Sequence, residues 1–245
     1  MKTHRVVFNT VALALLVGAI SSTAGAQGRG RGRGDQGDHD RQGDRGRVSA
    51  DEQRRREDEQ RARDARYRAA LDQRVVVAQQ HAAQLAQEHR SAMAAQHAQY
   101  LANLRAQQER LRAERDYRRD PYFTAPPQYR YHYSNFSRTT NQYGADQLKQ
   151  AVNVGYQQGY QSGRADKQDG RRSNYAQSYG YLDANYGYNA SYVEQSDYNY
   201  YFREGFRRGY ADGYANATQY GSFQNGTPLM LAGVLAAILG LAQIH

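Results

Sequence analysis

Cysteine and tryptophan are absent from this 245-residue chain, and proline occurs only four times. Without cysteine, the protein has no disulfide framework, no thiol nucleophile and no thiolate metal ligand. Large aliphatic residues are also scarce, since the hydrophobic fraction is 39% and that fraction includes 22 tyrosines. This composition offers little material for a large aliphatic core, which argues against an ordinary enzyme-sized globule.

Catalytic motifs are missing as well. The sequence contains no Gly-Lys-Ser/Thr phosphate loop, no His-Glu-x-x-His and no Gly-x-Ser-x-Gly. The nearest approach to the last pattern, at 159–163, has its serine one position late. We therefore expect a protein that is not an enzyme and that needs neither a cofactor nor a metal.

Positive charge is in excess but diffuse. Lysine and arginine total 33 against 24 aspartates and glutamates, which gives a formal charge of +9. Because this excess is spread along the chain without a concentrated basic patch, we expect no specific nucleic-acid site. Weak attraction to polyanions is the most that this charge distribution predicts.

Residues 1–26 have the features of a secretory signal. Two basic residues precede an apolar stretch at 6–20, and Ala24 and Ala26 form a small-x-small cleavage site. An uncleaved N-terminal anchor is the alternative, although the apolar stretch is short for a membrane span. The prediction is export, with the periplasm or the cell envelope as the destination.

A leader rich in arginine, glycine and aspartate follows at 27–48. Its low hydrophobicity predicts a disordered, solvated segment. Arginine-glycine runs also occur in proteins that bind nucleic acid, but no aromatic residue is interleaved here.

The segment 49–120 has the composition of one uninterrupted helix. Ser49 and Glu52 form a capping box at its start, and neither glycine nor proline follows until Pro121. Between residues 71 and 85 the apolar positions follow in steps of four and three, a coiled-coil-like spacing. The prediction is a single helix of about 105 Å.

Three histidines recur at intervals of eight within this segment: His81, His89 and His97. Eight residues rotate a helix by about 800° and advance it by about 12 Å, so successive histidines point in different directions. One metal ion cannot be bound by two of them from a straight helix. We expect these histidines to face solvent or an interface.

Residues 121–144 contain three of the four prolines and five tyrosines, a composition that is typical of a linker. Tyrosine is concentrated from this point onward, with 19 of the 22 between residues 121 and 227. The linker therefore separates two regions of different composition.

A duplicated glycine–aromatic motif occupies residues 145–221. Residues 155–163 align without a gap with residues 205–213, at an offset of 50. We expect each copy to form a helix, the first over 145–170 and the second over 192–217.

The ends of these two helices also have sequence signals. Asp146 is a candidate cap for the first helix, and Gly170 is a candidate stop. Ser191 and Glu194 have the spacing of a capping box before the second helix.

Residues four apart lie on one ridge of a helix, so the motif glycines predict a smooth groove beside a ridge of aromatic side chains. The ridge of one copy would lie in the groove of the other. Three interior glycines cost about 3 kcal/mol of helix propensity, and burial of each aromatic side chain, worth roughly 1.5–3 kcal/mol, offsets that cost. A flexible segment is the alternative. The groove consists of Gly155, Gly159, Gly163, Gly205, Gly209 and Gly213, and the ridge of Tyr156, Tyr160, Phe202, Phe206, Tyr210 and Tyr214.

At 201–214 the second copy reads Tyr-Phe-Arg-Glu-Gly-Phe-Arg-Arg-Gly-Tyr-Ala-Asp-Gly-Tyr. This motif resembles a group of uncharacterised secreted bacterial proteins, which combine paired Tyr-Arg-x-Gly-Phe-x-x-Gly-Tyr-x-x-Gly-Tyr repeats with a signal peptide and a short apolar C-terminus. The resemblance covers residues 145–245 and leaves out 49–120. It implies export and no known activity.

An apolar stretch without a charged side chain lies at 228–244. As one helix it would be about 26 Å long, just short of the ~30 Å hydrocarbon core of a bilayer. Three interpretations remain open: a membrane-inserted tail, a helix packed on this chain or on a second copy, and a lipid-anchor signal that is removed. In each interpretation the apolar stretch is removed from water, because apolar segments of this length are rarely exposed.

The expected fold is mainly α and elongated, with a long coiled-coil-like helix, a pair of Gly-x-x-x-Gly helices, an apolar C-terminal helix and extensive disorder. The favoured hypothesis is an exported, non-catalytic scaffold of the bacterial cell envelope. It would associate with itself through helix packing and contact a membrane through 228–244. The alternative is a module that binds extracellular polyanions or polysaccharide through its many tyrosines and the 31 basic against 24 acidic residues that remain after 1–26 are removed.

Overall fold

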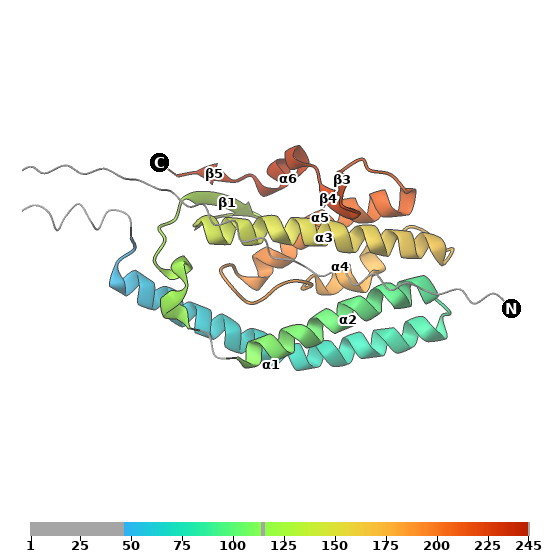
Figure 1. Cartoon of the computed structure of the whole chain (residues 1–245), viewed down its shortest axis with the longest axis horizontal. Helices are drawn as coiled ribbons and strands as arrows, with labels where there is room; N and C mark the ends of the chain where they lie inside the picture. Colours follow the sequence, from blue (N-terminus) through green and yellow to red (C-terminus); the bar gives the residue numbers. More distant parts are fainter. Residues whose placement is uncertain (1–46, 114–115, 245) are drawn as a thin grey trace, which may run out of the picture. The chain divides into compact units, whose positions relative to one another are not determined.

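Helix is the main secondary structure in the computed structural model, which describes residues 47–113 and 116–244 (Figure 1). The predicted signal at 1–26, with Ala24 and Ala26, lies outside the described residues, as does nearly all of the leader at 27–48.

Within 49–113 the chain forms two antiparallel helices, α1 (Ala50–Gln87) and α2 (Ser91–Arg112), which pack as a hairpin (Figure 1). The start of α1 is the predicted one, because Ser49 Oγ accepts a hydrogen bond from the backbone N–H of Glu52 over 3.2 Å. The prediction of one uninterrupted helix is wrong, and with it the reason for expecting an elongated chain.

The helix stops where the sequence carries no conventional stop signal. The backbone N–H of Arg90 donates to the carbonyl of Leu85 over 3.0 Å, and the N–H of His89 donates to the carbonyl of Ala86 over 3.2 Å. These two bonds form a Schellman motif, in which His89 takes the left-handed conformation with φ of 54°. Glycine usually occupies this position, so the sequence does not predict a helix break at a histidine.

Residues 121–144 are not the linker expected from their prolines. They contain a β-hairpin that packs beside the helices. Tyr131 is buried in its first strand, and Phe123 is buried in the turn that precedes the hairpin. Asp120 accepts a hydrogen bond from the N–H of Tyr122 and so caps a short 3₁₀ turn that begins with Pro121. The elements are η1 (Tyr117–Arg119), η2 (Pro121–Phe123), β1 (Tyr129–Tyr133) and β2 (Phe136–Thr140).

The duplicated motif forms two parallel helices that pack along their whole common length. Gly155 lies against the backbone of Phe202, and two turns further on Gly163 lies against the backbone of Tyr210. Because these contacts follow in the same order along both helices, the two helices run parallel. The helices are α3 (Gln142–Gln168) and α5 (Gln195–Ala215), and the chain between them contains η3 (Tyr175–Gln177) and α4 (Tyr179–Asp183).

The predicted stop of the first copy is confirmed, whereas its predicted cap is wrong. Gly170 follows α3 with φ of 66°, in a Schellman motif like the one at His89. The cap is Asn141, whose Oδ1 accepts from the N–H of Gly144 over 3.2 Å, and Asp146 lies inside the helix.

The capping box predicted for the second copy is also wrong. α5 begins after Glu194, which occupies the N-cap position without a side-chain cap, and Ser191 lies in the preceding loop. The carboxylate of Glu194 instead accepts from Arg63 of α1 over 2.7 Å. A tertiary ion pair has therefore taken the side chain that a local cap would use.

The apolar stretch 228–244 does not form the single helix that was expected. It contributes a strand to a hairpin, a short helix, and a strand at the edge of the first sheet, which has the order β2–β1–β5. No helix in the described residues is both long enough and apolar enough to cross a membrane. The elements are β3 (Gly221–Gln224), β4 (Thr227–Met230), α6 (Ala232–Leu239) and β5 (Ala242–Gln243).

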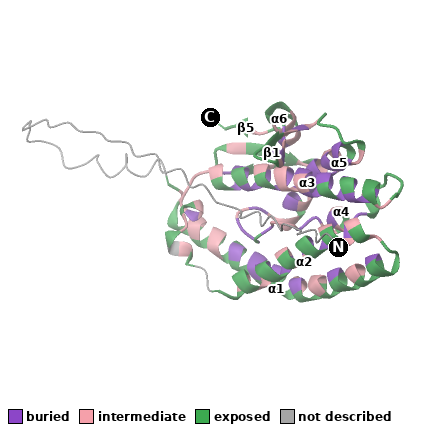
Figure 2. Ribbon diagram, turned by 45° about the vertical axis from the view of Figure 1, so that its right-hand side comes forward, coloured by how far each residue is buried: buried purple, intermediate pink, exposed green. Residues whose placement is uncertain are grey.

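The core is largely aromatic, and buried residues line the facing surfaces of the helices (Figure 2). Tyrosine thus supplies the apolar area that scarce aliphatic residues do not, provided that each buried hydroxyl finds a partner. The argument from scarce aliphatic residues against an ordinary enzyme-sized globule left out this contribution of tyrosine. The largest fully buried side chains are Tyr67, Tyr100, Tyr156, Tyr188, Tyr198, Tyr201, Tyr210, Phe123, Phe202 and Phe206.

Candidate functional site

The six motif glycines lie at the contact between α3 and α5. A Cβ on any of them would come closer than 3.0 Å to a main-chain carbonyl oxygen of the opposite helix. The contacts alternate between the helices, so that Gly159 faces Phe206 and Gly209 faces Tyr156. Only glycine permits two helix backbones to approach this closely.

The groove holds backbone rather than the aromatic side chains expected there. The carbonyl oxygens of the ridge residues Phe202, Phe206 and Tyr210 lie against the glycines, while their rings stack along the helix. The ring centroids are 6.0 Å apart for Phe202 and Phe206 and 6.4 Å apart for Phe206 and Tyr210. Tyr214 continues the stack at 6.1 Å.

Two tyrosine–aspartate hydrogen bonds link the helices. Tyr156 donates to Asp212 Oδ2 over 2.7 Å, and Tyr210 donates to Asp166 Oδ2 over 2.6 Å. With the offset of 50, each tyrosine reaches a carboxylate six positions beyond its own in the other copy. Burial, followed by the hydrogen bond to aspartate, raises the pKa of both tyrosines. Both therefore remain hydrogen-bond donors at neutral pH.

These contacts give the duplicated motif a structural role inside one chain. Every glycine of the predicted groove contacts the backbone of the helix formed by the other copy. A second protein cannot use the same groove while the two helices are paired.

Two of the three regularly spaced histidines meet across the α1–α2 hairpin. The ring centroids of His81 and His97 are 4.8 Å apart, and His97 Nε2 donates to the carbonyl of Ala78 over 2.8 Å. The two rings meet because the turn at His89 folds the eight-residue spacing back on itself. The expectation that the histidines face solvent or an interface holds for the exposed His89 but is wrong for His97, which is buried within the chain. The ring of Tyr179 stacks on His81 with centroids 5.2 Å apart.

This histidine pair predicts a loss of stability on acidification. Burial, with smaller contributions from His97 and Arg90, lowers the pKa of His81 to about 4, against the opposing effect of Glu88. Between pH 6.5 and 4 the unfolded chain therefore binds a proton that the folded chain excludes, and stability falls as pH falls. The slope for one proton is at most about 1.4 kcal/mol per pH unit. Urea unfolding of wild type and of His81→Gln from pH 7 to 5 should show that stability falls less steeply with pH in the variant. Equal slopes for the two proteins would refute the assignment.

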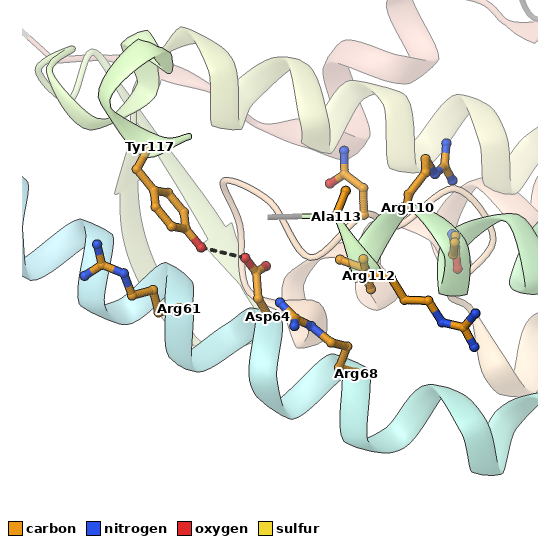
Figure 3. A pocket seen from close by; sticks show the side chains of 10 residues that line it. Arg61, Asp64, Arg68, Arg110, Arg112, Ala113 and Tyr117 are labelled. Atoms are coloured by element: carbon orange, nitrogen blue, oxygen red, sulfur yellow. Dashed lines mark hydrogen bonds between the residues drawn. The ribbon is translucent and has the colours of Figure 1, made fainter. Parts of the chain in front are cut away.

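A pocket with a volume of about 620 Å³ lies between α1 and α2. Arg61 and Arg68 reach it from α1, and Arg110 and Arg112 reach it from α2 (Figure 3). One carboxylate, that of Asp64, is the only acidic side chain among the described lining residues. The other lining residues are Gln107, Leu111, Ala113, Tyr117 and Asn189.

The single carboxylate already has hydrogen-bond partners. Asp64 is buried and accepts from Gln60 Nε2 over 2.7 Å and from the hydroxyl of Tyr117 over 2.9 Å (Figure 3). The carboxylate therefore serves to hold Tyr117 at the pocket. Arg61 lies over the Tyr117 ring, with its guanidinium carbon 5.2 Å from the ring centroid.

The four arginines differ in their ionic partners. Arg61 pairs with Asp58 over 2.9 Å, and Arg112 pairs with Glu109 over 3.0 Å, in exposed pairs along their own helices. Neither Arg68 nor Arg110 forms an ion pair with any carboxylate in the part of the chain that the structure describes. Two guanidinium groups at this pocket are thus available to an anion.

The pocket could not be found from the sequence. Its arginines lie more than 40 positions apart along a segment that looked like one straight helix. They come together only because the chain turns at His89. The high arginine content of 49–120 was the sole signal, and it did not indicate which arginines would meet.

No metal site is formed by clusters of histidine, aspartate and glutamate within residues 47–113 and 116–244.

A comparison with known protein families, curated proteins and solved structures gave no match for this chain.

Proposed function

We propose that this protein is a non-catalytic binding module that takes an acidic group of an extracellular polyanion into the arginine-lined pocket. The observation that carries the proposal is the pair of unmatched arginines, Arg68 and Arg110, at a pocket of about 620 Å³. A volume of this size accepts a ligand as large as one or two sugar units.

Arginine suits such a role better than lysine. Its planar guanidinium donates two parallel hydrogen bonds to a carboxylate, sulfate or phosphate. Arg68 and Arg110 come from different helices, and therefore they approach a ligand from two sides. Export, predicted from residues 1–26, would place the module where acidic polysaccharides occur.

Heparin binding tests the proposal. The double variant Arg68→Ala/Arg110→Ala should bind heparin at least about tenfold more weakly than wild type, with a salt dependence reduced by about two released counterions. The measurement is a titration with fluorescently labelled heparin at several salt concentrations, with neutral dextran as the uncharged probe.

A matched variant controls for lost charge. Arg54→Ala/Lys149→Ala removes two positive charges from exposed positions that do not line the pocket. If both double variants lose affinity equally, net charge rather than the pocket attracts the polyanion, and the proposal fails.

The second proposal is the exported envelope scaffold, with a contact different from the one first expected. Because the motif glycines are paired within the chain, self-association and membrane contact need another surface. The exposed apolar residues of 228–244, such as Leu231 with 41% of its surface exposed, favour that region. Flotation of the full chain with lipid vesicles tests this; recovery of all protein in the unbound fraction would refute the membrane contact.

A further inference from the structure

The turn between α1 and α2 combines two conflicting tendencies. The local sequence favours helix without a break, since 49–120 contains neither glycine nor proline. The turn nevertheless requires His89 to adopt φ of 54°. A residue other than glycine adopts this left-handed conformation with strain, because its Cβ crowds the neighbouring backbone carbonyl.

Contacts from another element hold the turn closed. The carboxylate of Asp169 accepts from the backbone N–H groups of Ala92 over 3.0 Å and Met93 over 2.9 Å. It thereby caps the first turn of α2, which has no side-chain cap of its own. Arg90 adds an ion pair with Asp166. The hairpin therefore depends on the end of α3 as much as on its own sequence.

We propose that a second copy of this chain is a partner, and that the two copies exchange α1. Residues 88–90 become helical in this state, so that α1 and α2 join into one long helix. The α1 of each copy then packs against the α2 and the core of the other copy. This inference goes beyond the proposed function and does not depend on it.

The exchange preserves the contacts that α1 makes within one chain, because the second copy offers the same partners. These contacts are extensive. They include the hydrogen bonds from Gln60 to the Ala190 carbonyl, from Arg63 to Glu194 and from Tyr67 to Gln107.

The difference between the two states is confined to the turn. Opening removes the left-handed conformation at His89 and gives the first N–H groups of α2 carbonyl partners on the preceding helical turn. In the open state the cap from Asp169 is no longer needed. Association of two copies costs translational and rotational entropy, so the fraction of dimer depends on protein concentration.

Two substitutions at the same residue test the hinge. Glycine tolerates the left-handed conformation and disfavours a continuous helix, whereas alanine does the reverse. In light scattering of the full chain, refolded over a range of concentrations, His89→Gly should raise the dimer dissociation constant at least about tenfold above that of His89→Ala. Asp169→Ala should lower that constant relative to wild type, because it weakens only the closed hairpin.

A cross-link distinguishes exchange from simple association. Gln108 donates a hydrogen bond to Asp72 across the hairpin, and the chain contains no cysteine. In Asp72→Cys/Gln108→Cys, a short bifunctional maleimide should join the two positions within one chain in the monomer fraction and between chains in the dimer fraction. Links confined to one chain in both fractions, or dimerisation that is equal in His89→Gly and His89→Ala, would overturn the proposal. Loss of heparin binding would leave these results unchanged.

Discussion

Replacing Gly209 with alanine should lower the free energy of unfolding by about 3 kcal/mol or more, although alanine is the better helix former. A Cβ at this position would come closer than 3.0 Å to the carbonyl oxygen of Tyr156, which belongs to the backbone of α3. Backbone cannot rotate away as a side chain can, so the two helices must separate. Overpacking of this kind typically costs about 1–3 kcal/mol, and here it also loosens the aromatic contacts along the whole pair.

The predicted loss exceeds the gain in helix propensity. Glycine to alanine inside a helix is worth about 1 kcal/mol. Gly159→Ala should behave like Gly209→Ala, because Gly159 faces the carbonyl of Phe206 in the equivalent way. The measurement is urea unfolding, monitored by far-UV and near-UV circular dichroism.

Gly233→Ala is the matched control. Gly233 lies in α6, and a Cβ there would meet no atom within 4 Å. This variant should be as stable as wild type or more stable by up to about 1 kcal/mol. Equal effects at Gly209 and Gly233 would mean that close backbone packing does not hold α3 to α5.

The second large effect is expected for Asp212→Ala, which should cost about 3–5 kcal/mol of stability. The Asp212 carboxylate is buried and accepts three hydrogen bonds: from Tyr156 over 2.7 Å, from the N–H of Gln219 over 3.1 Å and from the N–H of Tyr220 over 2.9 Å. Hydrogen bonds to a charged group contribute about 1.5–3 kcal/mol each, and the variant leaves buried donors unpaired.

Two variants separate this carboxylate from a general loss of charge. Tyr156→Phe removes one of the three hydrogen bonds and should cost about a third as much. Asp146→Ala removes an exposed carboxylate from α3, and its stability should stay within about 0.5 kcal/mol of wild type. A small effect at Asp212 beside a large one at Tyr156 would show that the tyrosine contributes by packing and not through its hydroxyl.

The two copies of the motif form an internal counterpart of a symmetric helix dimer. Their helices are parallel, and equivalent glycines face equivalent carbonyls in both directions. The tyrosine–aspartate hydrogen bonds follow the same six-residue spacing in both directions but lie one turn apart. One chain thus contains the kind of contact that a single copy of the motif would need two chains to make. Any self-association would then need other surfaces, and the proposed exchange of α1 uses one.

Helix ends show where inference from sequence succeeds and where it fails. The same Schellman motif ends α1 at His89 and α3 at Gly170. The second was predictable because glycine has no steric cost in the left-handed conformation. The first was not, since histidine gives no such signal and the cap that stabilises the turn comes from Asp169, almost 80 positions away. Local propensity cannot report a cap supplied by another element.

The sequence by itself determined the helical character of most of the described chain, the first helix start at Ser49, and the glycine spacing of α3 and α5. These features depend on local chemistry: side-chain caps, helix propensity and the four-residue ridge. Only the tertiary structure decided that 49–120 folds back, that 121–144 forms strands and that 228–244 divides among two strands and one helix. It also decided which arginines meet at the pocket. These outcomes depend on contacts between distant segments, where burial of tyrosine and pairing of Asp169, Asp166 and Glu194 outweigh what neighbouring residues prefer.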